Sequence, residues 1–207
     1  MTSKKMVIAT IALWTACGSA MALDSQTTQT TEAPASYALQ PGPHFILNGG
    51  LTYGGDTLAT AIYNDGSTKD IKAGSLIQLG MGMLWQMQDR PLALQITANY
   101  QVDRASGSNG SLTFSRYPIE GLLYYTAKER MRLGLGARYV LSPSFEDKVG
   151  TPFTANFDNA VGLVGEFGYA LSPVFWMNFR LVSEKYQFNT SSFSGNHAGI
   201  NFTYQFE

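Results

Sequence analysis

Five ionisable residues stand at alternating positions along the middle and later parts of the chain. They are Glu120, Arg132, Arg138, Glu166 and Arg180. Each lies between apolar or small neighbours, as in the segment RLGLGARY at positions 132–139. Because successive side chains of a strand point to opposite faces, these charges should share the face that the apolar residues leave. Enclosed charges are costly unless they are paired, so the mixture of signs predicts salt bridges between strands.

A histidine with two potential partners is the second candidate for chemistry. Hydrolysis by a serine nucleophile needs a histidine as base and an acid that orients the histidine. His197, Ser194 and Glu184 are close enough in sequence to meet at one end of neighbouring strands. The alternative is that His197 is a polar residue at the rim of the last strand, and we favour this non-catalytic interpretation.

The acids in the connecting segments suit solvated turns better than a metal site. Calcium needs several converging oxygens, and the spacing of these acids matches no dedicated calcium loop. The only cysteine, Cys17, lies in an N-terminal segment that we expect to be removed. We therefore expect no metal, no disulfide and no cofactor. The acids are Asp56, Asp65, Asp70, Glu146, Asp147 and Asp158.

The first 43 residues have the composition of a targeting segment and a linker. Lys4 and Lys5 precede an apolar core at 6–16, and Ala20 and Ala22 offer a small–x–small cleavage site. Residues 1–22 are therefore predicted to be a signal peptide. Residues 23–43 are rich in Thr, Gln, Ser, Ala and Pro without apolar periodicity, which predicts a disordered, flexible periplasmic linker.

The remainder, residues 44–207, has the composition of a β-domain in contact with lipid. Of the 207 residues only 14% are charged, 13% are aromatic and 21 are glycine. No apolar run after position 43 reaches the length of a spanning helix, so a membrane domain here must be a closed barrel. The sequence has no basic stripe, and we expect no nucleic-acid partner.

Eight alternating segments make up this domain. Short turns follow the second, fourth and sixth of them, and longer polar connections such as 104–110 and 142–157 follow the odd-numbered ones. This asymmetry is typical of outer-membrane barrels, with short periplasmic turns and long extracellular loops. We predict an all-β fold, an eight-stranded antiparallel up-and-down transmembrane β-barrel with both ends periplasmic. The segments are 45–53, 71–85, 92–102, 111–126, 131–141, 159–169, 174–186 and 195–206.

Three details of these segments make further predictions. The first segment could continue past Gly54 to Tyr63, before a hairpin turn at 64–66. The second segment is predicted to be one uninterrupted strand with Ile71, Ala73, Ile77 and later odd-numbered residues on a single face. Pro118 predicts a bulge or a break in pairing within the fourth strand.

The last segment should close the barrel by pairing with 45–53. Ala198, Ile200, Phe202, Tyr204 and Phe206 share its apolar face. This face should contact lipid, and Phe202, Tyr204 and Phe206 should serve as the assembly signal of the closing strand. A soluble barrel would reverse the sense of the alternation. The ionic, glycine-rich polar face argues against a soluble barrel, because small or paired residues suit a tight lumen better than a solvated surface.

The five charges would then lie in the lumen, where two roles are open. They could form a salt-bridged plug, or they could line a gated solute path or a proton relay. An eight-stranded barrel has an interior just wide enough for side chains to fill. We therefore favour the plug.

With the strands placed, the chain resembles the superfamily of small eight-stranded bacterial outer-membrane β-barrels. The resemblance covers residues 43–206 and is carried by GGLTYGGDTLATAIYNDG, FSRYPIEGLLYY, RLGLGARY and the ending FTYQF. It implies a C-terminal aromatic read by the barrel assembly machinery, although here Glu207 follows Phe206. The C-terminal layout is also similar to lipid A deacylase barrels. Their seventh strand carries His-x-Ser, whereas this chain has Ser183 followed by Glu184 with no histidine beside them.

These observations predict a non-catalytic integral barrel of the outer membrane with a structural, envelope-integrity or surface-interaction role. One alternative is a narrow channel for small or apolar solutes, permitted by the glycines at 74, 80 and 82. A second is a lipid A-modifying, deacylase-like enzyme. The expected partners are outer-membrane lipid, lipopolysaccharide and the barrel assembly machinery, with the protein itself a monomer. Lys69, Lys72 and Lys148 are candidates for contact with lipopolysaccharide phosphates.

Overall fold

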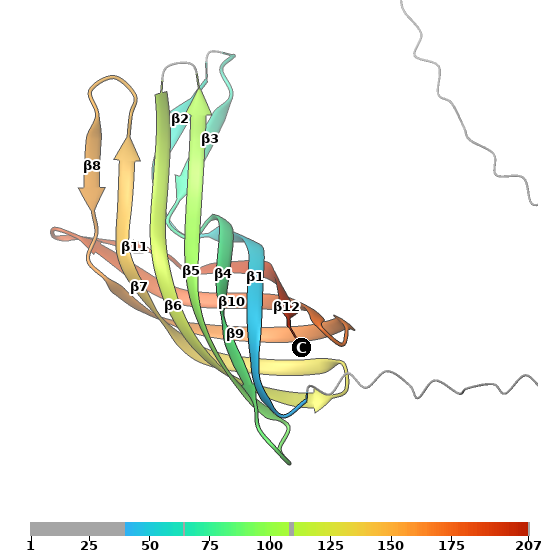
Figure 1. Cartoon of the computed structure of the whole chain (residues 1–207). Helices are drawn as coiled ribbons and strands as arrows, with labels where there is room; N and C mark the ends of the chain where they lie inside the picture. Colours follow the sequence, from blue (N-terminus) through green and yellow to red (C-terminus); the bar gives the residue numbers. More distant parts are fainter. Residues whose placement is uncertain (1–39, 64, 108–109, 207) are drawn as a thin grey trace, which may run out of the picture. The chain divides into compact units, whose positions relative to one another are not determined.

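A computed structural model describes residues 40–63, 65–107 and 110–206, which form a β-barrel with projecting hairpins (Figure 1). The predicted signal peptide, residues 23–39 of the predicted linker and Glu207 lie outside the described residues. The first strand begins at Gly42, two residues before the expected start of the barrel domain.

Eight strands close the barrel in the described residues. Each pairs antiparallel with the barrel strand that precedes it in the chain, and β12 pairs with β1 from Ile46–Gln205 to Gly54–His197. This ring confirms the predicted all-β, eight-stranded up-and-down architecture. The barrel strands are β1 (Gly42–Gly54), β4 (Leu76–Gln86), β5 (Leu92–Gly107), β6 (Gly110–Lys128), β7 (Met131–Asp147), β9 (Ala160–Ser172), β10 (Phe175–Phe188) and β12 (His197–Gln205).

The two ends of the barrel differ in the length of their connections. At one end, called here the short-turn end, β4 joins β5, β6 joins β7 and β9 joins β10 through a few residues each. At the other, the long-hairpin end, β5–β6 and β7 extend beyond the ring beside four shorter strands (Figure 1). These shorter strands are β2 (Thr57–Ile62), β3 (Thr68–Lys72), β8 (Phe153–Asn156) and β11 (Ser191–Ser194).

The predicted second strand is wrong in one respect, because the segment 71–85 is broken. Its first part belongs to β3, which pairs only with β2, and β4 starts at Leu76 after a turn. The turn changes the phase of the alternation: Ile71 and Ala73 are fully buried, whereas Ile77 faces outward. The first strand does not continue to Tyr63 either, because residues 57–62 form a separate strand that pairs with β3. The chain leaves the barrel after Gly54 and forms the β2–β3 hairpin.

Two predicted loops are also strands. The segment 104–110 extends β5 and β6, which pair as far as Gly107–Gly110. The segment 142–157 continues β7 to Asp147 and returns as β8, pairing from Ser144–Asn156 to Asp147–Phe153. The sequence did not indicate these strands, because polar and turn-forming residues dominate both segments even though Ala105, Phe145 and Ala155 are buried on one face.

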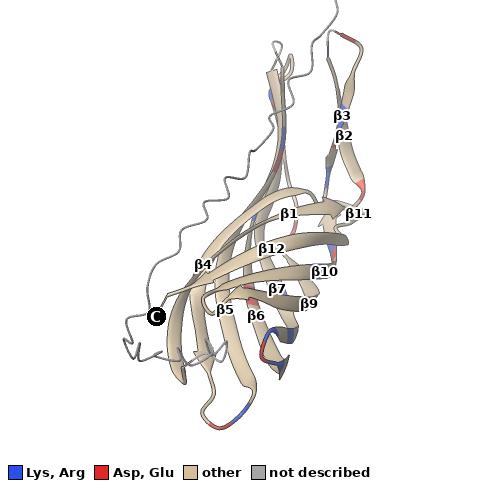
Figure 2. Cartoon of the chain, turned by 90° about the vertical axis from the view of Figure 1, so that its right-hand side faces the viewer, with Lys and Arg blue, Asp and Glu red and all other residues tan. Residues whose placement is uncertain are grey.

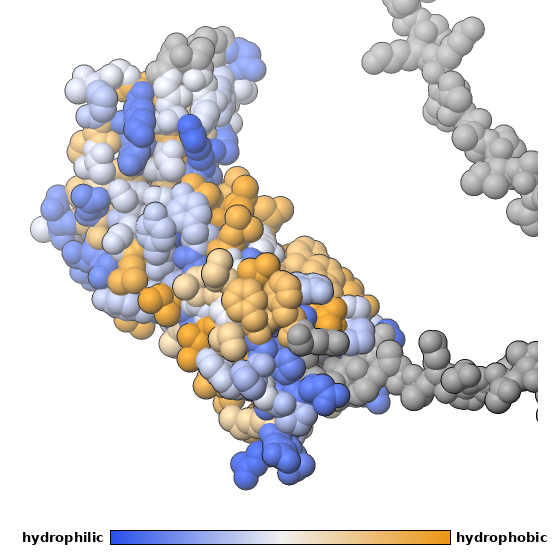
Figure 3. All heavy atoms as spheres, viewed as in Figure 1, coloured by the Kyte–Doolittle hydropathy of each residue, from blue (hydrophilic) through white to orange (hydrophobic). Residues whose placement is uncertain are grey.

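The outer wall carries the apolar side chains. Leu135, Val161 and Leu181 have 71%, 70% and 68% of their surface exposed, although all three are aliphatic. Figure 3 shows an apolar zone across the barrel, with hydrophilic residues gathered on the hairpins and on the short turns. In Figure 2 the charged residues likewise concentrate in the hairpins and turns, and the strands are mostly uncharged. An apolar belt between two polar rims is what a lipid bilayer requires of a barrel.

Tight strand curvature explains two of the glycines in the wall. A Cβ added to Gly82 or Gly136 would lie 2.0 Å from a carbonyl oxygen of the neighbouring strand. Pro118, as predicted, interrupts pairing: the β5–β6 ladder passes from Ala98–Ile119 to Gln101–Arg116 and leaves Pro118 unpaired on that side. The freed Pro118 carbonyl accepts a hydrogen bond from Asn99 Nδ2 at 3.3 Å.

We expect Leu135→Arg to lower the free energy of unfolding by about 2–4 kcal/mol in lipid vesicles, because the change puts a charge on the lipid-facing wall. Val149→Arg, in the exposed connection after β7, is the matched control and should change it by less than about 1 kcal/mol. Urea unfolding followed by tryptophan fluorescence measures both. Equal effects would mean that the wall at Leu135 does not face lipid.

Candidate functional site

The lumen holds all five charged residues singled out in the sequence. Each is at most 6% exposed. They come from β6, β7, β9 and β10, four consecutive strands on one side of the ring. Period-two alternation is sufficient to place them there, because each side chain lies on the face opposite to the apolar wall. The residues are Glu120, Arg132, Arg138, Glu166 and Arg180.

Arg180 is the centre of this group. Its guanidinium is bidentate on Glu120, with Nη2–Oε2 at 2.6 Å and Nη1–Oε1 at 3.2 Å. Its Nε also donates to Glu166 Oε1 at 2.7 Å. The second oxygen of Glu166 accepts a hydrogen bond from the Tyr124 hydroxyl at 2.5 Å. One cation thus bridges two carboxylates from different strands, a geometry in which charge-assisted hydrogen bonds are strongest.

Arg138 continues the network toward the long-hairpin end. Its Nε lies 3.5 Å from Glu120 Oε1 and 3.2 Å from Glu184 Oε2. Its Nη2 donates to Gln101 Oε1 at 3.0 Å. The other oxygen of Glu184 accepts from the Tyr186 hydroxyl at 2.6 Å. Together these contacts make one chain of alternating acids and bases across the barrel.

Arg132 differs from the other predicted charges. Its guanidinium is stacked between two rings, 4.2 Å from the centre of Tyr124 and 4.4 Å from that of Trp176. Its Nη2 donates to the amide oxygen of Asn178 at 3.0 Å. In the described part of the chain no carboxylate lies within 4.0 Å of it. The charge is compensated by two π faces, an amide and the more distant Glu166.

Three charged residues of the lumen were missed by the sequence reasoning: Asp103 on β5, which is 2% exposed, and two members of the network. Arg116 is fully buried, donates to Gln101 Oε1 at 3.2 Å and stacks over Phe114. Glu184 lies in the lumen, although the sequence suggests it as the acid of a possible triad. Both have the same parity as a predicted lumen charge on their strand, Glu120 and Arg180 respectively, so alternation alone could have found them.

The charges of the described lumen balance. Four arginines, at 116, 132, 138 and 180, face four acids, at 103, 120, 166 and 184, and each is at most 6% exposed. A balanced set avoids the cost of an uncompensated ion in a medium of low dielectric constant.

An apolar cluster fills the lumen beyond the charges, toward the long-hairpin end. Phe114, Phe157 and Tyr186 pack edge to face, with ring centroids 5.6–6.4 Å apart. Ile71 from β3 is fully buried in the same cluster. The β2–β3 hairpin lies outside the ring of barrel strands, but its Ile71 side chain helps to cover the lumen.

Of the possible triad, the structure brings His197 Nδ1 to 3.7 Å from Glu184 Oε1 but does not bring Ser194 to the ring. Its ring is buried, Nδ1 lies 2.7 Å from the Gly195 carbonyl and Nε2 lies 3.4 Å from Arg138 Nη1. These contacts place the proton on Nδ1 and leave Nε2 as an acceptor for Arg138. Ser194 Oγ instead accepts a hydrogen bond from the Asn196 backbone at 3.4 Å. His197 is therefore a lumen residue, fully engaged, and not an exposed residue of the rim.

The predicted closing-strand residues lie on the outer wall. Phe202, Tyr204 and Phe206 are 39–43% exposed. Phe206 contacts Tyr204 and Phe45 through ring centroids 4.8 and 5.4 Å apart. Its backbone N–H donates to the Phe45 carbonyl at 2.9 Å. Phe206 therefore extends the contact between the last barrel strand, β12, and the first, β1.

The predicted lysines lie in the projecting hairpins. Lys69 Nζ donates to the Arg104 carbonyl, and Lys72 lies 5.1 Å from the ring centre of Tyr53. Lys148 forms an exposed ion pair with Glu146 at 2.7 Å. Among the acids, the pKa of Asp65 is lowered by hydrogen bonds from the hydroxyl and the backbone of Ser67. Within the described residues no group of His, Cys, Asp or Glu is arranged to hold a metal, and no helix is long and apolar enough to cross a membrane.

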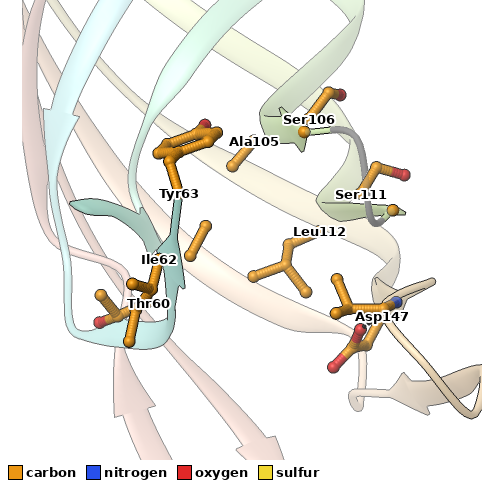
Figure 4. Close-up of a pocket in the computed structure, with 12 residues that line it drawn as sticks. Thr60, Ile62, Tyr63, Ala105, Ser106, Ser111, Leu112 and Asp147 are labelled. Carbon is orange, nitrogen blue, oxygen red and sulfur yellow. Dashed lines mark hydrogen bonds between the residues drawn. The ribbon is translucent and has the colours of Figure 1, made fainter. Parts of the chain in front are cut away.

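A pocket of about 320 Å³ lies between the projecting hairpins (Figure 4). Ile62 and Tyr63 line one side, Leu112 forms part of the floor, and Ser106 and Asp147 supply polar atoms. A second pocket, of about 270 Å³, opens at the short-turn end. It reaches inward to Tyr124, Arg132 and Trp176 and is bounded outside by the β4–β5 turn.

Comparisons with known proteins agree with this fold. No protein-family model and no curated protein matches the sequence. Neisserial surface protein A (NspA) is 11% identical with a TM-score of 0.50, covering 80% of this chain and 97% of its own. Ail, the attachment invasion locus protein of Yersinia pestis, is 11% identical with a TM-score of 0.48, covering 81% and 100%. The outer membrane protein AlkL is 13% identical with a TM-score of 0.43, covering 84% and 95%. The likeness to NspA confirms, at the level of fold, the predicted resemblance to small eight-stranded outer-membrane barrels.

We expect Arg180→Met to lower the free energy of unfolding by about 3–5 kcal/mol, because two buried carboxylates lose the cation that they share. The matched control is Arg104→Met, on an exposed part of β5, which should change it by less than about 0.5 kcal/mol. Urea unfolding in lipid vesicles measures both. Equal losses would show that the lumen network does not stabilise the barrel.

Proposed function

We propose that this protein is a non-catalytic barrel of the outer membrane whose lumen is plugged and whose hairpins contact molecules at the cell surface. The observation that carries the proposal is the layered filling of the lumen. From the short-turn end inward come the stacked Arg132, the ion pairs around Arg180 and the apolar cluster around Phe114. A lumen filled in this way favours a role in envelope structure or surface interaction over transport through the barrel.

The asymmetry of the two ends supports an orientation. Short turns and both ends of the described barrel lie together, as shown by the contact between Phe206 and Phe45. Outer-membrane barrels place short turns in the periplasm. The hairpins β2–β3, β5–β6 and β7–β8 would then project outside the cell, with the pocket of Figure 4 between them.

The partners follow from this orientation. The apolar belt would contact outer-membrane lipid. Lys69 and Lys72 lie in β3 and Lys148 follows β7, where lipopolysaccharide phosphates would be within reach. During biogenesis the aromatic residues of β12 would be read by the barrel assembly machinery. The closed ring leaves no barrel strand of the described residues unpaired, which supports a monomer.

Two features weigh against the channel and the enzyme. The ladders β1–β4 and β4–β5 continue without a register shift. On the lumen side of Gly80, the amide of Asn99 occupies the place that a side chain would take. The strand pairing therefore leaves no lateral gap at the glycines of β4. His197 is engaged with Arg138 and Gly195, which leaves no free base for an ester hydrolysis. The closed, non-catalytic barrel is therefore the function that the geometry supports best.

Planar-bilayer recording tests the plug. We expect the purified protein to show no discrete conductance steps, and Glu166→Gln to be equally silent, because the Arg132 stack and the apolar cluster still close the lumen. A porin recorded in the same bilayer is the positive control. Steps in Glu166→Gln alone would show that a single ion pair gates a path.

Surface labelling tests the orientation. We expect Val149→Cys to react with a membrane-impermeant maleimide on intact cells, because Val149 lies in the connection between β7 and β8. Lys128→Cys, at the β6–β7 turn, should react only after the outer membrane is permeabilised. Cys17, the only native cysteine, lies in the predicted signal peptide and would not contribute. The reverse pattern would contradict the proposed sidedness.

A further inference from the structure

The pocket at the short-turn end combines a buried cation with an unused hydrogen-bond donor. Arg132 and Trp176 both line it, and each is only 2% exposed. The indole Nε1 of Trp176 has no hydrogen-bond partner in the described structure. A buried donor without a partner is costly, so its presence beside a cavity indicates a missing acceptor.

The guanidinium beside it also lacks an anionic partner at short range. Arg132 donates from Nε and Nη2 to one neutral amide oxygen, that of Asn178, at 3.3 and 3.0 Å. Its faces are occupied by the rings of Tyr124 and Trp176, so further polar contacts can form only in the plane of the guanidinium. A planar fork that is held by stacking matches the two oxygens of a carboxylate.

We propose that this pocket binds a small carboxylate with an apolar body, held by Arg132 and by the Trp176 indole N–H. The proposal does not depend on the role of the hairpins at the opposite end. The acid group would supply the acceptor that Trp176 lacks and a counter-charge for Arg132.

The remaining walls define the body of the ligand. Pro41, Met87, Pro91 and Ala93 line the pocket between the lumen and the β4–β5 turn. The charges of Asp89 and Arg90 at the mouth cancel each other. The lining therefore carries a net charge of +1, which comes from Arg132. A cavity of about 270 Å³ admits a ligand the size of an aromatic acid. A phosphate or sulfate would leave the apolar walls uncovered.

The probe is 4-fluorobenzoate, observed by fluorine NMR with the intact protein in detergent micelles and with empty micelles as blank. We expect saturable binding to the protein, and none of the uncharged isostere 4-fluorobenzamide. Trp176→Phe keeps the ring and removes the N–H, and should weaken binding about 10-fold or more, since a hydrogen bond to a charged group is lost. Arg132→Met should abolish binding.

Lys128→Gln is the matched control, because it removes an exposed cation from another short turn outside the pocket lining. It should bind like the unmodified protein. Folding of each variant is checked by its heat-modifiable migration on gels, and Trp176→Phe keeps the test valid if Arg132→Met does not fold. Unsaturable binding, equal binding of the amide, or unchanged affinity in folded Trp176→Phe would overturn the proposal.

Discussion

An eight-stranded barrel has almost no interior to spare, and the rest of this structure depends on that constraint. Each side chain that points inward must be covered by others that point inward, because there is no room for a continuous column of water. Arg180 shows the consequence. Its guanidinium contacts Glu120 and Glu166 on different strands, so neither acid is left to water. The network therefore fills the lumen and neutralises its charges at the same time.

Low dielectric constant makes such a network cooperative. Removing one partner leaves a buried charge that nothing nearby can replace, whereas removing a surface charge costs little. The structure limits this risk by balancing four arginines against four acids and by using neutral partners where acids are absent. Arg132 illustrates the second device, with two aromatic faces and the amide of Asn178 around it.

Much of the barrel could be predicted from the sequence, because lipid outside and a tight lumen inside impose a strict period of two. That period alone assigns the outward and inward residues of β12 correctly, and it is enough to place both Glu120 and Arg180 in the lumen. It fails where the lipid constraint ends. The turn at Ala73 reverses the phase of the second strand. The segments of the β5–β6 and β7–β8 hairpins are predicted to be loops because polar and turn-forming residues dominate their sequences, although Leu112 and Phe145 are buried on one face.

The partners within the lumen could not be predicted in the same way. Alternation shows that a residue points inward, but its depth depends on strand tilt and register, which are set by the whole ring. The sequence therefore did not show that His197 would meet Arg138 rather than Ser194. Nor did it show that the β2–β3 hairpin would return Ile71 to cover the lumen.

Hydrogen exchange at the Arg180 guanidinium tests the plugged lumen most directly. In a lipid nanodisc, NMR can follow exchange of the Nε–H that donates to Glu166 with solvent. If the lumen is closed, this proton should exchange orders of magnitude more slowly than the corresponding proton of the exposed Arg104. Exchange of the two protons at the same rate would show that water passes freely through the barrel, and would contradict the plug.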